Sequence, residues 1–123
     1  MNLGYRKLNV WIKAKQLCLY TYDITKKFPK EELYALTSQI RRAVISIPSN
    51  IAEGCAKNSL KEQLRFIEIS CGSYYELTTQ MEIARDINYI NDKQYEEFLK
   101  VADDLGRLLF GYKKSLCSRI EED

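Results

Sequence analysis

The sequence contains no histidine, so it lacks the side chain used most often for general acid–base catalysis and metal binding near neutral pH. It also has no glycine-rich phosphate loop, no GxSxG nucleophile elbow and no Glu-x-x-His pair of the kind found in di-iron bundles. The four cysteines, Cys18, Cys55, Cys71 and Cys117, form no CxxC pair. We interpret them as reduced, small apolar side chains, with metal binding and redox chemistry as the alternatives. We therefore expect no enzyme, no metal and no cofactor.

Proline and glycine are scarce, with two and five residues among 123, whereas 46% of the residues are hydrophobic. This composition favours an all-α chain, and the length fits a single domain over residues 1–123. No apolar run approaches the ~20 residues that span a bilayer, and the N-terminal residues lack the apolar segment of a signal peptide. We expect a cytoplasmic protein that does not associate with a membrane.

Residues 36–54 carry the most informative pattern in the chain. Read as a helix at about 100° per residue, they place apolar residues on one face and five polar residues on an adjoining face. Because this polar stripe borders the core, we expect it to form a buried hydrogen-bonded network whose members depend on one another. The polar stripe consists of Gln39, Arg42, Ser46, Asn50 and Glu53.

Two residues of the same segment disturb a regular helix. Pro48 has no N–H and crowds the carbonyl of Val44, so we predict that the helix is kinked at Pro48 but not broken. Gly54 follows the last apolar residue of the pattern. We predict that Gly54 adopts the left-handed conformation that ends a helix.

Apolar periodicity predicts four amphipathic helices. They extend over about residues 9–27, 31–53, 60–88 and 92–117. Because the connections between them are short, the simplest fold is an all-α, antiparallel up-down-up-down four-helix bundle. We expect the fourth helix to fray after Lys114.

Local signals support the third and fourth helices. Ser59 with Glu62, and Asn91 with Gln94, have the spacing of capping boxes. Gly72, inside the third helix, would be explained by the close approach of another backbone. These two helices also carry apolar residues beyond the needs of one core, which a self-associating surface would cover. The residues in question are Phe66, Ile69, Tyr75, Ile83, Ile87, Tyr95 and Leu99.

The net charge of +2 is unevenly distributed along the chain. Residues 1–30 hold seven basic residues against one acidic residue, a net charge of +6, and residues 31–123 hold twelve against sixteen, a net charge of −4. Such asymmetry can mark a nucleic-acid surface, although a solvated helix face gives the same pattern. The candidate nucleic-acid contacts are Arg6, Lys7, Lys13, Lys15, Lys26, Lys27 and Lys30.

Several of these motifs together resemble a known family. The matching residues are Leu8, Trp11, Ala14 and Leu17, the pair Phe28-Pro29, the runs 36–43 and 46–54, and Gly72-Ser73 with Glu76. The sequence resembles the four-helix-bundle proteins encoded in intervening sequences of bacterial 23S rRNA genes, which are often labelled ribosomal proteins. The resemblance implies a homopentameric, barrel-like ring. It also implies kinship with the accessory protein of diversity-generating retroelements, which binds nucleic acid and a reverse transcriptase.

These observations support one leading hypothesis and two alternatives. The leading hypothesis is a non-enzymatic, ring-forming bundle that binds RNA, DNA or a ribonucleoprotein. The first alternative is a protein–protein interaction scaffold that binds an unidentified protein and no nucleic acid. The second, an enzyme with Glu53 as a base beside Arg42, is disfavoured because an arginine lowers the pKa of a neighbouring carboxylate.

Overall fold

The computed structural model describes residues 3–122, which form an all-α structure without strands in that range. Its four long helices are α1 (Asn9–Thr25), α2 (Leu36–Cys55), α3 (Leu60–Asp86) and α4 (Asp92–Glu122). Two short 3-10 turns, η1 (Gly4–Lys7) and η2 (Lys30–Glu32), precede α1 and α2. The predicted fold class is confirmed.

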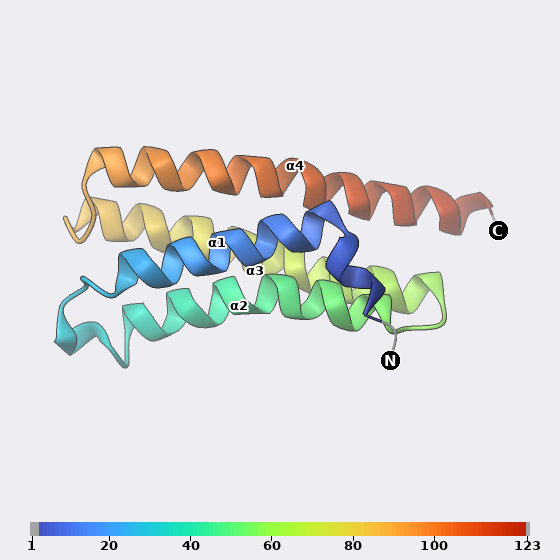
Figure 1. Cartoon of the computed structure of the whole chain (residues 1–123), viewed down its shortest axis with the longest axis horizontal. Helices are drawn as coiled ribbons and strands as arrows, with labels where there is room; N and C mark the ends of the chain where they lie inside the picture. Colours follow the sequence, from blue (N-terminus) through green and yellow to red (C-terminus); the bar gives the residue numbers. More distant parts are fainter. Residues whose placement is uncertain (1–2, 123) are drawn as a thin grey trace.

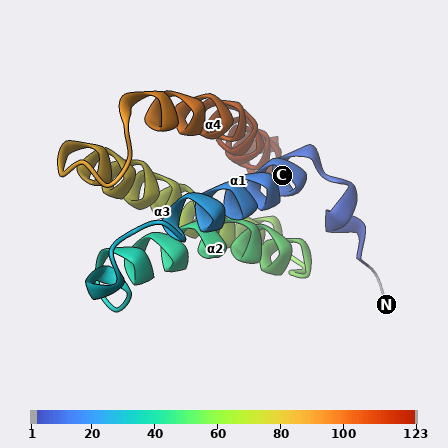
Figure 2. The same ribbon diagram turned by 60° about the vertical axis from the view of Figure 1, so that its left-hand side comes forward.

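Successive helices run in opposite directions, so the bundle has up-down-up-down topology (Figure 1). Each helix packs against its neighbours in sequence, and α1 also packs against α4, which closes the bundle. The α1–α2 and α3–α4 connections lie at one end (Figures 1 and 2). The η1 turn, the α2–α3 turn and the C-terminal part of α4 lie at the other, so three segments distant in sequence meet there.

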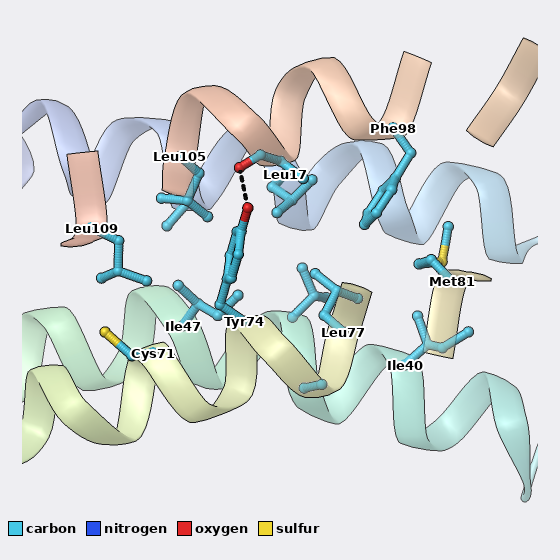
Figure 3. Packing of buried hydrophobic residues seen from close by; sticks show 14 of the residues in the cluster. Leu17, Ile40, Ile47, Cys71, Tyr74, Leu77, Met81, Phe98, Leu105 and Leu109 are labelled. Carbon is cyan, nitrogen blue, oxygen red and sulfur yellow. Dashed lines mark hydrogen bonds between the residues drawn. The ribbon is translucent and has the colours of Figure 1, made fainter. Parts of the chain in front are cut away.

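All four helices contribute fully buried side chains to one core (Figure 3). Leu17, Ile47, Leu77 and Leu105 represent α1 to α4 in this core, and none of them is accessible to solvent. Burying such a side chain contributes about 1.5–3 kcal/mol relative to leaving it exposed. The common core therefore accounts for the association of helices whose sequences are individually only amphipathic.

Two helix boundaries differ from the predicted ones by five residues, and the others agree within two residues. The second helix begins at Leu36, because residues 30–32 form the separate turn η2 and Ala35, at φ −124° and ψ −107°, is not helical. The fourth helix continues to Glu122 and does not fray after Lys114. Leu116 is fully buried, and this contact holds the last turns of α4 against the bundle.

The predicted helix starts are confirmed in detail for α4 and in part for α3. The backbone N–H of Gln94 donates to Asn91 Oδ1 at 2.8 Å, and the N–H of Asn91 donates to Gln94 Oε1 at 2.9 Å. At α3 the N–H of Glu62 donates to Ser59 Oγ at 3.2 Å, without the reciprocal bond in the described residues. Both N-caps satisfy amides that a helix leaves free.

The expected surplus of apolar residues on α3 and α4 is only partly present. Tyr95 was predicted to lie outside the core, but it is buried, because the Arg85 guanidinium covers its ring at 4.4 Å and Phe98 stacks on it. Phe66 and Leu99 are half-buried. The remaining four are exposed: Ile69, Tyr75, Ile83 and Ile87.

The predictions for two glycines were wrong. No glycine in the described residues has a positive φ, and Gly54 lies inside α2, where it is buried. A Cβ at residue 54 would lie 3.3 Å from both the Gln63 carbonyl oxygen and the Phe66 Cβ, so Gly54 allows close packing of α2 on α3. Gly72 is exposed and has nothing within 4 Å of its Cβ position, so it serves no close approach within the chain.

A third glycine has a role that the sequence did not reveal. The Tyr74 hydroxyl crosses the core and donates to the Ala102 carbonyl of α4 at 2.9 Å (Figure 3). A Cβ at residue 106 would lie 2.6 Å from Tyr74 Oη and 3.0 Å from Tyr74 Cζ. Gly106 therefore leaves the space that this hydrogen bond requires.

Pro48 is accommodated inside an unbroken α2, as predicted, and the extent of bending there stays a prediction. Because Pro48 has no N–H, the Val44 carbonyl loses its usual donor four residues later. The Cys18 thiol of α1 donates to this oxygen at an Sγ–O distance of 3.0 Å. Burial raises the pKa of Cys18 to about 12, so the thiol keeps its proton at neutral pH. Cys18 thus replaces the missing backbone donor.

The role of Gly106 predicts opposite effects of alanine at two positions of α4. Gly106→Ala should lower the free energy of unfolding by about 1–3 kcal/mol, because the buried Tyr74 ring cannot move aside without strain. Gly111→Ala is the control, because Gly111 is exposed with nothing within 4 Å of its Cβ position, and it should stabilise by about 0.5–1 kcal/mol. Urea unfolding measures both, and equal effects would contradict this packing.

The pairing of Cys18 with Val44 predicts an energetic coupling between Cys18 and Pro48. Cys18→Ala should cost about 1–3 kcal/mol, because it leaves a buried carbonyl without a donor. In a Pro48→Ala background the alanine N–H can bond to Val44, so Cys18→Ala should cost at least about 1 kcal/mol less. A double-mutant cycle by urea unfolding measures the difference. Additive effects would show that Cys18 acts only through packing.

Candidate nucleic-acid interface

The polar stripe of α2 forms a network at its centre only. Asn50 Nδ2 donates to the Ser46 carbonyl at 2.8 Å and to Ser46 Oγ at 2.9 Å, and Ser73 Oγ of α3 donates to Ser46 Oγ at 2.8 Å. Nearby, Ser70 Oγ of α3 donates to the Ile47 carbonyl at 2.9 Å. Ser46 and Asn50 are half-buried, so this part of the stripe is an α2–α3 contact.

The network does not extend to the other three residues, and the prediction was wrong for them. Gln39, Arg42 and Glu53 are exposed, and their side chains make no hydrogen bond or ion pair within residues 3–122. The short serines of α3 reach only the middle of the stripe, so the longer side chains remain in water, where they stay hydrated. Arg42 and Glu53 are eleven residues apart, about 16 Å along a helix, so Arg42 cannot position Glu53 as a base.

Arg41, next to the stripe, is used inside the chain. Its Nε donates to Thr25 Oγ1 at 3.0 Å, and its guanidinium lies 4.7 Å from the centre of the Tyr22 ring. Both contacts join α2 to α1. Arg41 is therefore half-buried and links α1 to α2.

The seven candidate basic residues do not form one surface. Arg6 and Lys7 lie on η1, whereas Lys26, Lys27 and Lys30 lie beyond the far end of α1, whose 17 residues span about 25 Å. Between them, two lysines point to separate partners. Lys13 pairs with Asp104 of α4 at 4.0 Å, and Lys15 lies over the Trp11 ring at 5.5 Å from its centre.

The fold instead separates charge between its two ends. The basic end comprises residues 3–9, 53–68 and 111–122, which hold eight basic and five acidic residues, a net charge of +3. The acidic end comprises residues 23–35 and 82–97, which hold five basic and eight acidic residues, a net charge of −3. Lys26, Lys27 and Lys30 therefore lie among an excess of carboxylates.

Six basic residues that the sequence analysis did not select join Arg6 and Lys7 at the basic end. Lys57 Nζ and Arg65 Cζ lie 5.0 and 5.7 Å from the centre of the Phe66 ring. The additional basic residues are Lys57, Lys61, Arg65, Lys113, Lys114 and Arg119. The linear charge count missed them because neighbouring glutamates cancel them along the sequence. Mapping charge onto the predicted up-down topology would have found them.

A cavity of about 600 Å³ opens at the basic end, between η1, the α2–α3 turn and α4. Its charged residue is Lys57, and no carboxylate lines it within the described chain. Burial raises the pKa of the Tyr112 hydroxyl, and the neighbouring Cys55 thiol adds to the shift, so the hydroxyl is protonated at neutral pH. The lining residues are Gly4, Tyr5, Leu8, Ala52, Cys55, Ala56, Lys57, Asn58, Gln63 and Tyr112.

The described residues show no arrangement that indicates catalysis or metal chemistry. No group of three or more Cys, Asp or Glu residues in residues 3–122 has the geometry to hold a metal ion. All four cysteines are free, and Cys71 is buried while the other three are half-buried. None of the described helices is both long enough and apolar enough to cross a membrane.

Comparison with known proteins agrees with the motif resemblance. A solved structure of a protein of unknown function from the S23 ribosomal protein family of Bacteroides thetaiotaomicron matches with a TM-score of 0.79. The two sequences are 22% identical, and the match covers 85% of this chain and 98% of that chain, which shows a common fold. No curated protein matches the sequence. The model of the 23S rRNA-intervening sequence protein family matches residues 6–111, and the chain belongs to this family.

Proposed function

We propose that this protein is a non-enzymatic, cytoplasmic, ring-forming bundle that binds single-stranded RNA or DNA, or a ribonucleoprotein, at its basic end. The observation that carries the proposal is the convergence of η1, the α2–α3 turn and the end of α4 into one region of net charge +3. Lysine and arginine side chains release counterions from phosphates, which is the main source of affinity in such complexes.

Aromatic residues at the same end support a nucleic-acid ligand over a simple anion. Tyr5 and Tyr112 line the cavity there, and Phe66 lies beneath Lys57 and Arg65. Basic side chains beside exposed aromatic faces are typical of surfaces that bind single strands without strong sequence preference. The acidic end also pairs a basic side chain with an aromatic ring, Arg85 with Tyr95, but its net charge of −3 would repel phosphates.

The ring is proposed on the family resemblance and on the exposed apolar residues of α3. Ile69, Tyr75 and Ile83 are 43–60% exposed, more than a single bundle requires. A homopentamer of 14.4 kDa chains would have a mass of about 72 kDa. Light scattering measures the mass in solution, and a monomeric mass would remove the ring from the proposal while leaving the basic end intact.

The location of the interface predicts a difference between two matched triple variants. Arg6→Gln, Lys57→Gln and Lys61→Gln together should weaken binding of a labelled single strand at least about tenfold at low salt. The slope of log affinity against log salt should fall in magnitude by about 2, since each lost phosphate contact contributes about 0.7. Lys26→Gln, Lys27→Gln and Lys30→Gln remove the same charge at the acidic end and should change neither quantity.

Fluorescence anisotropy over about 50–200 mM salt distinguishes the outcomes. An equal or larger loss for the acidic-end variant would reject the basic end as the interface. No binding by the unmodified protein at about 50 mM salt would reject the nucleic-acid proposal altogether.

The second candidate function is a protein–protein scaffold, and one surface favours it. Leu33, Tyr34 and Ile45 are 45%, 93% and 45% exposed. Together with Tyr22 and Arg41 they line an open groove of about 570 Å³ on the α1–α2 side of the bundle. Apolar residues gathered in this way are typical of protein contacts.

A scaffold role predicts a partner whose capture is independent of nucleic acid. Capture of the partner should survive nuclease treatment. The double variant Leu33→Asp, Ile45→Asp should no longer capture it, because docking in the groove would bury an unpaired carboxylate. Leu19→Asp on α1 is the control, since Leu19 is 64% exposed but lies outside the groove. Quantitative mass spectrometry after affinity purification measures the difference. Nuclease-sensitive capture would instead support the basic end.

A further inference from the structure

We infer that the cavity at the basic end receives one unstacked base of a single-stranded nucleic acid, with the Tyr5 ring as its stacking surface. This inference rests on the proposed function and adds the part of the strand that is recognised, an unstacked base, and the residue that recognises it. The volume of the cavity, about 600 Å³, is within the range of sites that enclose small organic molecules. The cavity is thus large enough for a nucleic-acid base, an uncharged group that the surrounding basic residues do not attract electrostatically.

The lining of the cavity combines the surfaces that a base requires. Leu8, Ala52 and Ala56 provide apolar walls, and Asn58 and Gln63 provide amides. An amide carries both donors and an acceptor and can therefore bond to the edge of an unpaired base. The lining thus presents polar and apolar surface together, which suits a planar ring with polar edges better than a free phosphate.

Tyr5 is held in a fixed orientation before any ligand arrives. Its ring meets the Trp11 ring edge-on, with centres 5.2 Å apart and planes inclined at 66°. Trp11 in turn lies beneath the Lys15 ammonium group. A ring held by its neighbours loses little conformational freedom when a base stacks on it, and such stacking strengthens binding about fivefold to a hundredfold per base.

Hydrogen bonding also fixes one of the amides. Gln63 Nε2 donates to the Lys57 carbonyl at 3.1 Å across the α2–α3 turn. This bond occupies one donor of the amide and leaves its carbonyl oxygen as an acceptor for a ligand. The same turn presents Lys57, the charged residue among those that line the cavity in the described chain. A base in the cavity would therefore have its phosphate near a cation.

The position of the cavity selects single strands. A base in a duplex is stacked and paired, and turning it out costs a few kcal/mol per base, whereas a single strand presents its bases freely. The cavity opens among basic residues of three segments, so a backbone that follows them can place a base inside. Recognition of a flexible single strand, rather than of a helical groove, follows from this arrangement.

The test compares an ordinary oligodeoxyadenosine of about 12 nucleotides with an abasic strand of equal length and charge. The unmodified protein should bind the ordinary strand at least about fivefold more tightly. Tyr5→Ala should bind both strands equally, whereas Tyr5→Phe should keep the preference because it retains the ring. Tyr34→Ala at the acidic end is a matched control, since Tyr34 is 93% exposed, and should leave the preference unchanged.

A spectroscopic measurement locates the stacked base independently. A single 2-aminopurine in the strand should be quenched on binding to the unmodified protein and to Tyr5→Phe, but not to Tyr5→Ala. If Tyr5→Ala does not fold, comparing the affinities of the unmodified protein for the ordinary and abasic strands still tests whether a base is bound. Equal affinity for the two strands would overturn the base site while the basic interface stands. Failure to bind either strand would overturn the interface itself.

Discussion

The bundle depends on how it compensates for Pro48, a residue without an N–H inside its most tightly packed helix. The Val44 carbonyl must find a donor outside α2, and the Cys18 thiol of α1 supplies it at 3.0 Å. On the other side, Ser70 of α3 bonds to the Ile47 carbonyl. A buried carbonyl without a donor costs about 1–3 kcal/mol, so α1 must keep its register relative to α2. Pro48 therefore constrains the position of α1, whereas Ser70 joins α3 to a carbonyl that the proline does not deprive of its donor.

Small residues allow the other polar contacts between helices. Serine reaches a backbone carbonyl of the neighbouring helix only if the helices are close, and Gly54 removes the side chain that would separate α2 from α3. On the opposite side of the core, Gly106 similarly leaves room for the Tyr74 hydroxyl to bond with α4. The four helices are thus joined by a few polar contacts at positions where glycine or serine permits them. Apolar burial provides the main driving force, and these contacts select the register.

Sequence patterns correctly predicted features that depend on residues nearby in the sequence. They failed for features that depend on packing against another helix. The bond between Asn91 and Gln94 is local, so its spacing alone predicted the start of α4. Gly54 has the spacing of a helix end, but the close approach of Phe66 explains it better, and Phe66 is twelve residues away. Arg42 and Glu53 were predicted to be buried because they border an apolar face. Only the packing of α3 reveals that its serines reach Ser46 and Ile47, in the middle of α2, and that Arg42 and Glu53 stay exposed.

The charge distribution likewise could not be predicted from residues counted along the sequence. Along the sequence, basic residues are concentrated before residue 30, but α1 carries them to opposite ends of the bundle. An even number of antiparallel helices returns the C-terminus to the end where the chain begins, beside the middle turn (Figure 1). Three distant segments with net charges of +2, 0 and +1 then form one region of +3, although no single segment is strongly basic. In a ring whose subunits lie parallel, the basic ends would share one rim, so a modest +3 per chain would become a strong local field. If the proposed ring forms, topology and assembly together would give a weakly basic chain a field that attracts a polyanion, without a strongly basic sequence.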